Sequence, residues 1–152
     1  VLGLYETSRA RIKVALDPEL PLVSGDASQL RQIIHNLLRN AEDAQDGFDD
    51  AQVLVSTRSI EGMAELSVSD GGPGFPPEMM ARVFEPYVTT KAGGTGLGLA
   101  IVKKIVDEHQ GRIRINNLQP TGAEVSIRIP LAQRMTPNTS SSEIPGRDGA
   151  IT

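Results

Sequence analysis

The 152 residues are enough for one domain with a single apolar core, and 39% of them are apolar. No apolar run approaches the roughly 18 residues of a membrane helix, which excludes a bilayer-spanning segment. The net charge of -4 argues against a nucleic-acid partner, and the absence of cysteine excludes disulfides, zinc–cysteine sites and thiol nucleophiles.

The first predicted elements are a strand and a long helix. Residues 11–16 alternate polar and apolar side chains, which predicts a strand, and Asp17-Pro18 ends it. A helix follows, capped by Asp26 or Ser28, and Asp46-Gly47 stops it. Its apolar positions recur at helical spacing: Leu30, Ile33, Ile34, Leu37, Leu38, Ala41 and Ala44.

The middle of the chain predicts a hairpin and then a long excursion. Residues 52–59 and 64–69 alternate around a Glu61-Gly62 turn, as in an antiparallel hairpin. The glycine- and proline-rich stretch 71–96 follows, within which residues 77–84 predict one short helix. Loops of this length in compact domains are usually functional lids.

The last part predicts a second helix at residues 97–109, ended by Gly111, and then strands at residues 112–116 and 124–129. Strands and helices that do not strictly alternate predict an α+β two-layer sandwich, with a mixed, mostly antiparallel sheet covered by the helices. We expect residues 132–152, which are polar, to form a disordered tail or linker.

Three segments carry residues suited to chemistry, and the first is a polar stripe on the first helix. At 100° per residue, Asn36, Asn40 and Asp43 lie on one side, at the border of the apolar face. Their carbonyl and carboxylate oxygens are the hard ligands that Mg²⁺ prefers. The alternative is a solvated helix flank.

The second segment is Asp70-Gly71-Gly72-Pro73-Gly74-Phe75, where a carboxylate ends a strand and glycines allow close backbone approach. A buried, ionised Asp70 only accepts hydrogen bonds, so it suits the exocyclic amine of adenine and rejects the carbonyl of guanine. The alternative is an ordinary turn, because Asp-Gly is common in turns.

The third segment, residues 93–99, is a glycine run that opens a helix, where unpaired amides and the helix dipole suit phosphate oxygens. It lacks the Gly-Lys-Ser/Thr of a Walker loop, and Leu99 stands where the dinucleotide fingerprint has its third glycine. The absence of His-Arg-Asp and Asp-Phe-Gly motifs excludes the serine/threonine kinase fold.

In this order the segments resemble the ATP-binding superfamily that includes histidine kinases, DNA gyrase, Hsp90-type chaperones and MutL proteins. Residues 34–41 look like its N box, 70–75 its G1 box, 84–87 its F box and 94–100 its G2 box. The resemblance covers residues 11–131. It implies the layered α/β sandwich of the Bergerat ATP-binding fold, with a flexible lid over ATP.

The resemblance also implies roles for single residues. Asn40 would bind Mg²⁺, Asn36 would assist at the phosphates, Asp70 would read adenine, and Lys91 in the lid would meet the γ-phosphate. The catalytic residues would be Asn36, Asn40 and Lys91. The ATP-binding set would be Asn36, Asn40, Asp43, Asp70, Gly72, Gly74, Phe75, Lys91, Gly94, Thr95, Gly96, Leu97 and Gly98.

Within the superfamily the residues favour a sensor histidine kinase. Gyrase-like ATPases have a glutamate at the position of Asn36, and an asparagine cannot take a proton from water, so the site would hold ATP for an external acceptor. The F box is typical of histidine kinases, and Tyr87-Val88-Thr89-Thr90-Lys91 is similar to NtrY-type nitrogen-regulation kinases.

By this resemblance the phosphorylated histidine lies on an upstream helical dimerisation domain, of which residues 1–10 would be the connecting remnant, and a response regulator is served indirectly. His35 and His109 are interpreted as surface or terminal residues instead. We expect a cytoplasmic, monomeric domain whose parent could be anchored in the bacterial inner membrane. The start at Val1, with no initiator Met, fits a fragment of a longer protein.

Two alternatives stay open. One is a degenerate nucleotide-binding interaction module, because Asp43 stands where many histidine kinases have a basic residue and Ala123 where a late Ser or Thr is common. The other is a stand-alone protein-serine kinase of the same superfamily.

Overall fold

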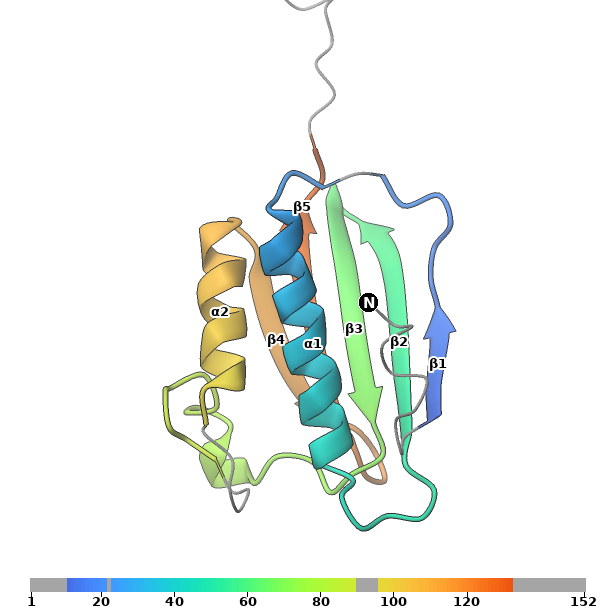
Figure 1. Ribbon diagram of the computed structural model, residues 1–152, viewed down its shortest axis with the longest axis vertical. Coiled ribbons are helices and arrows are strands. Elements are labelled where there is room, and N and C mark those ends of the chain that lie inside the picture. The colour runs from blue at the N-terminus through green and yellow to red at the C-terminus, as the bar shows by residue number, and fades with distance from the viewer. Residues whose placement is uncertain (1–10, 22, 90–95, 133–152) are drawn as a thin grey trace, which may run out of the picture.

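The computed structural model describes residues 11–21, 23–89 and 96–132, which form one sheet covered by helices (Figure 1). The elements in chain order are β1 Arg11–Ala15, α1 Ala27–Asp43, β2 Gln52–Ile60, β3 Met63–Asp70, the 3₁₀ turn η2 Pro77–Met79, α2 Gly98–Glu108, β4 Arg112–Asn117 and β5 Ala123–Pro130.

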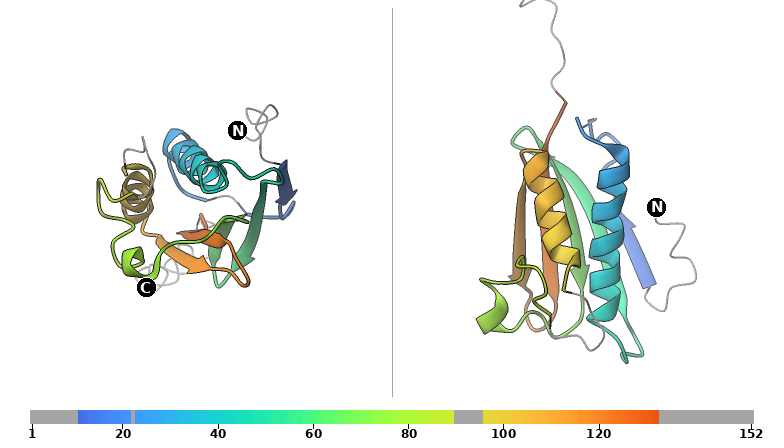
Figure 2. Two further views of the ribbon diagram at one scale, coloured as in Figure 1. Left: turned by 90° about the horizontal axis from the view of Figure 1, so that it is seen from below. Right: turned by 60° about the vertical axis from the view of Figure 1, so that its left-hand side comes forward.

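The sheet has five strands in the order β1-β2-β3-β5-β4. The β1–β2 pair is parallel, and the other three pairs are antiparallel. Both helices lie on one face of the sheet (Figure 2). The predicted α+β two-layer sandwich with a mixed, mostly antiparallel sheet is therefore confirmed.

One predicted helix is wrong in length. We expected a helix over residues 77–84, but only Pro77–Met79 forms a 3₁₀ turn. The following hydrogen bonds, such as Arg82 N to Met79 O at 2.8 Å, close separate four-residue turns. Val83 is only 4% exposed, so burial of this side chain shapes the segment, and a helix this short is costly to nucleate.

The first helix begins where a carboxylate satisfies its free amides. Oδ1 of Asp26 accepts hydrogen bonds from Ser28 N at 2.8 Å and Gln29 N at 3.1 Å, so Asp26 is the cap and Ser28 is not. The apolar face of α1 packs onto the sheet through Ile33, Leu37, Leu38 and Ala41. Neither helix among the described residues has the length and apolar character needed to cross a membrane.

A buried glutamine fixes the other end of α1 to the sheet. Gln45 is 3% exposed, and its Nε2 donates to Ala41 O at 3.2 Å and to Gln52 O at 2.9 Å. Its Oε1 accepts from Gln52 N at 2.9 Å. Because the side chain pairs with the first residue of β2 much as a strand would, it sets the position of the last turn of α1.

The sheet face away from the helices carries an ion-pair cluster around one buried glutamate. Glu65 on β3 is 7% exposed and lies between Arg58 on β2 and Arg128 on β5, at 2.6 Å and 2.7 Å. Burial raises the pKa of the Glu65 carboxyl, but the hydrogen bonds and charges of the two arginines outweigh it and hold that pKa below its ordinary value.

The substitution Glu65→Gln should lower the free energy of unfolding by about 1–2 kcal/mol at neutral pH, because a neutral amide replaces two charge-assisted bonds. The folded pKa is depressed, so the carboxylate stabilises the fold above the unfolded pKa and this contribution is lost as pH falls through the folded pKa. Urea unfolding of both proteins between about pH 7 and pH 3 checks this. A difference that stays constant over that range would contradict the assignment.

Candidate functional site

Three segments far apart in the sequence meet at one end of the sandwich. The carboxyl ends of α1 and β3 and the amino end of α2 all lie at the lower edge of the molecule (Figure 1). A Cβ atom at Gly72 would lie 2.7 Å from Ala44 O, so the loop after β3 lies directly against the end of α1. The predicted G1 box thus lies against the carboxyl end of the helix that carries the predicted N box.

The loop after β3 begins with a buried carboxylate. Asp70 is 9% exposed, and its Oδ1 accepts a hydrogen bond from Gly72 N at 2.9 Å. A Cβ atom at Gly72 would also lie 3.0 Å from that oxygen. Residue 72 is therefore glycine because the backbone must approach both Asp70 and α1.

The last residue of the same loop is held by a side chain that the sequence did not point to. Asn117, the last residue of β4, accepts from Phe75 N through Oδ1 and donates to Phe75 O through Nδ2, both at 2.8 Å. Gly74 has φ of 84°, and a Cβ there would lie 2.7 Å from Asn117 Oδ1. No motif pointed to Asn117, because only the folded chain brings it beside Phe75.

The polar stripe of α1 borders the core, as predicted. Asn36 and Asn40 are half-buried and Asp43 is exposed. Nδ2 of Asn36 is enclosed without a hydrogen-bond partner, the one buried side-chain N or O atom of this kind in residues 11–21, 23–89 and 96–132. A buried donor left without an acceptor lowers the stability of the fold by about 1–3 kcal/mol. As a donor, this atom suits an acceptor such as a phosphate oxygen.

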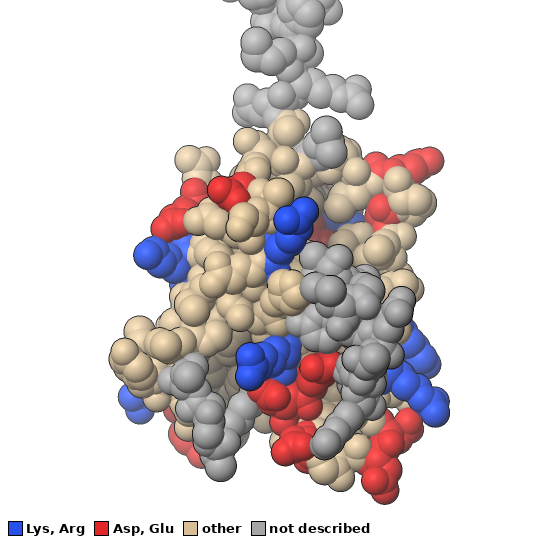
Figure 3. Space-filling view, in the orientation of Figure 1, with Lys and Arg blue, Asp and Glu red and all other residues tan. Residues whose placement is uncertain are grey.

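The end of α1 is strongly acidic. The last turn of the helix has no basic residue, and acidic side chains gather at the lower edge of this face (Figure 3). The segment carries Glu42, Asp43, Asp46, Asp49 and Asp50. These charges add to the negative end of the helix dipole, so a polyphosphate is repelled here unless a cation lies between.

The described residues contain no group of three or more His, Cys, Asp or Glu side chains that could hold a metal by itself. Mg²⁺ commonly takes only one or two protein ligands and completes its shell with phosphate oxygens and water. The residues of this site therefore fit a magnesium ion that arrives with a nucleotide.

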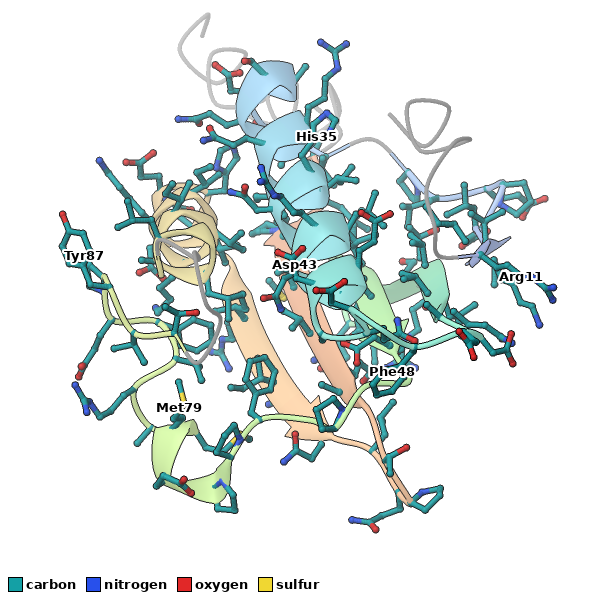
Figure 4. All side chains as sticks on the ribbon, turned by 60° about the horizontal axis from the view of Figure 1, so that its bottom comes forward. Arg11, His35, Asp43, Phe48, Met79 and Tyr87 are labelled. Atoms are coloured by element: carbon teal, nitrogen blue, oxygen red, sulfur yellow. The ribbon has the colours of Figure 1, made fainter. Side chains whose placement is uncertain are left out.

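The third predicted motif is described only in part. Lys91, Gly94 and Thr95 lie outside the described residues. Gly96 has φ of 72°, and its carbonyl oxygen accepts from Tyr87 N at 2.9 Å. In Figure 4 Tyr87 points away from both helices, in line with its 77% exposure.

Helix α2 starts beside this turn. Leu97 occupies the cap position and makes no side-chain cap hydrogen bond, and Gly98 begins the helix. The helix amino end therefore presents backbone N–H groups and the positive end of its dipole on the same side as the acidic end of α1.

The two histidines have structural surroundings. Nε2 of His109 accepts from Asp26 N at 3.2 Å, and its Nδ1 lies 2.8 Å from Ile105 O. This ring therefore joins the carboxyl end of α2 to the amino end of α1. His35 is half-buried on α1 (Figure 4).

Known proteins resemble the chain in both sequence and fold. The family model of histidine kinase-, DNA gyrase B-, and HSP90-like ATPases matches residues 25–133. An NtrY-like sensor histidine kinase of Rickettsia bellii is 43% identical over 108 residues, which is 71% of this chain and 18% of the relative. The chain thus spans less than a fifth of the length of this curated relative.

Solved structures agree with the sequence matches. The mycobacterial sensor histidine kinase MprB has a TM-score of 0.75 and 34% identity, over 85% of this chain and 88% of that one. Full-length ShkA in complex with AMPPNP has a TM-score of 0.75 and 32% identity, over 89% of this chain and 29% of that one. The predicted resemblance, to NtrY-type kinases in particular, is confirmed. The chain belongs to the family of histidine kinase-, DNA gyrase B- and HSP90-like ATPases, as an ATP-binding catalytic domain of the sensor histidine kinase type.

Proposed function

We propose that this domain binds Mg-ATP at the lower end of the sandwich and transfers the γ-phosphoryl group to a histidine of a separate dimerisation domain. The observation that carries the proposal is the enclosed Nδ2 of Asn36 on α1, which has no hydrogen-bond partner in residues 11–21, 23–89 and 96–132. A buried amide donor without an acceptor among the described residues suits a phosphate oxygen of the nucleotide.

The base and the phosphates would occupy different parts of the site. Asp70 would accept from the exocyclic amine of adenine, with Gly72, Gly74 and Phe75 as the wall of the base pocket. Asn36 and the amino end of α2, formed by Gly96, Leu97 and Gly98, would bind the phosphates. Lys91, Gly94 and Thr95 would complete the phosphate contacts from the lid.

Magnesium would lie between the phosphates and the end of α1. Asn40 would offer its amide oxygen, and Asp43, one turn further on, would act through the cation. The acidic end of α1 supports this assignment, because the charge that repels a bare polyphosphate attracts a divalent cation.

The site would catalyse transfer to a protein rather than hydrolysis. Phosphoryl transfer needs little covalent chemistry from the protein, only positioning and charge stabilisation. Bound Mg-ATP supplies the phosphoryl group, and Asn36 holds its oxygens without accepting a proton from water. The alternative, a degenerate and non-catalytic module, is favoured only by Asp43 and Ala123, which differ from the residues common in histidine kinases at these positions.

The partners follow from this reaction. The direct one is the upstream dimerisation and histidine phosphotransfer domain of the same protein, and a response regulator would receive the phosphoryl group afterwards. No nucleic acid is involved, and the isolated domain would be a cytoplasmic monomer whose parent is anchored in the inner membrane.

Calorimetric titration with ATP tests the site. Wild-type protein should bind ATP more tightly with Mg²⁺ than with EDTA. Asn40→Ala should reduce this Mg²⁺-dependent increase in affinity by a factor of about ten or more. Asn116→Ala is the matched control, because Asn116 is exposed on β4 and faces away from the site. An Asn40→Ala protein with undiminished Mg²⁺ dependence contradicts the metal assignment.

Phosphotransfer is tested by adding the histidine-bearing domain of the parent protein together with γ-labelled ATP. An acid-labile, alkali-stable phosphoprotein is expected, and replacing the acceptor histidine should abolish it. An acid-stable product would favour the protein-serine kinase, and ATP binding without any product would favour the degenerate module.

A further inference from the structure

We infer that Asn117 is a positioning residue for nucleotide binding, an inference that rests on the proposed function. Its side-chain amide pairs with the backbone of Phe75 through two hydrogen bonds of 2.8 Å, one donated and one accepted. This is the pattern by which two strands pair. The side chain therefore adds one rung to the sheet where the chain leaves it for the lid.

The anchor closes a ring around the base pocket. Asn117 pairs with Ala123 in the register of β4 and β5, and Ala123 pairs with Asp70 in the register of β5 and β3. Asp70, Ala123 and Asn117 therefore lie side by side across three neighbouring strands. The loop leaves β3 after Asp70, and its Phe75 returns to bond with Asn117 at the other side of this set. Asp70 and Phe75 cannot separate without breaking the bonds to Asn117.

The backbone around Gly74 is tightly packed, and the neighbouring Ala123 has no polar side chain that could replace Asn117. Gly74 lies so close to Asn117 and to Gly122 O that a Cβ would meet them at 2.7 Å and 3.1 Å. Ala123 is 4% exposed and brings only a methyl group to this row. The described side-chain bonds that hold Phe75 are those from Asn117, so this residue sets the geometry of the pocket before the nucleotide binds.

Nucleotide affinity and amide exchange together test the role of Asn117. Asn117→Ala should weaken ATP and ADP binding equally, by about tenfold, because the anchor acts at the base end and two neutral hydrogen bonds are lost. Hydrogen exchange of the Phe75 amide in the nucleotide-free protein should accelerate about tenfold or more, while the Val68 and Val125 amides of the core stay unchanged.

Two further variants separate positioning from general stability. Asn116→Ala, the neighbouring control, should change neither affinity nor Phe75 exchange. Asn117→Asp keeps an acceptor for Phe75 N but turns a carboxylate oxygen toward Phe75 O, so its affinity should also fall. A residue of purely structural importance would instead lower the melting temperature and leave the affinity of the folded protein unchanged.

The possible results have distinct meanings. Faster Phe75 exchange with unchanged affinity in Asn117→Ala overturns the positioning role, and unchanged exchange overturns the anchor itself. If wild-type protein binds neither nucleotide, the proposed function fails and the positioning role fails with it, while the exchange data still report on the anchor.

Discussion

Asp70→Asn should weaken ATP binding by about 100-fold while the domain stays folded. The carboxylate only accepts hydrogen bonds, and Oδ1 already accepts from Gly72 N at 2.9 Å. An asparagine would keep that bond through its amide oxygen. Its NH₂ group would then face the exocyclic amine of adenine, so two donors would oppose each other in a buried position.

The measurement is calorimetric titration with ATP in the presence of Mg²⁺, with Asp49→Asn as the matched control. Asp49 is an exposed residue of the segment between α1 and β2, and this variant carries the same change of charge. Equal losses in the two variants would mean that net charge, and not contact with the base, decides affinity. Full affinity in Asp70→Asn would remove Asp70 from the base pocket.

Gly122→Ala should lower the free energy of unfolding by about 3 kcal/mol. Gly122 has φ of 112°, a backbone conformation that an L-residue with a side chain rarely adopts, and a Cβ there would collide with the carbonyl oxygen of Asp70. The turn cannot easily relax, because Gly122 O also accepts from Leu118 N at 2.8 Å. The clash falls on the strand end that carries the proposed adenine contact.

Gly62→Ala is the matched control for this prediction. Gly62 also has a positive φ, of 77°, but a Cβ there would meet nothing within 4 Å. Gly62→Ala should lower the free energy of unfolding by only about 1 kcal/mol, which is the part of the effect that comes from the positive φ. Urea denaturation of both variants measures the difference, and equal losses would show that the collision with Asp70 contributes nothing.

The elements and the order of the motifs were predictable because they depend on local patterns. Alternation in residues 52–59 and 64–69 follows from the period of a strand, and the apolar spacing of α1 follows from the period of a helix. The glycines of the Asp70 loop are visible in the sequence because a close backbone approach tolerates no Cβ. These features need no knowledge of the remote chain.

The predicted site residues could be named in advance but not arranged. The sequence places Asn36, Asp70 and Gly98 in separate motifs, and only the sandwich brings the ends of their elements to one edge (Figure 1). The excursion after Phe75 was predicted less well. Burial of Val83, a tertiary effect, overrides the local helical tendency there.

Only the tertiary structure decided which partners the polar side chains of the loops and strands bond to. Asn117 bonds to Phe75 across 42 positions, and Arg128 bonds to Glu65 across 63. Gln45 likewise replaces a strand partner for Gln52. The partner of a polar side chain cannot be read from the periodicity of the sequence. Its hydrogen bond depends on which groups the packed helices and sheet bring within reach.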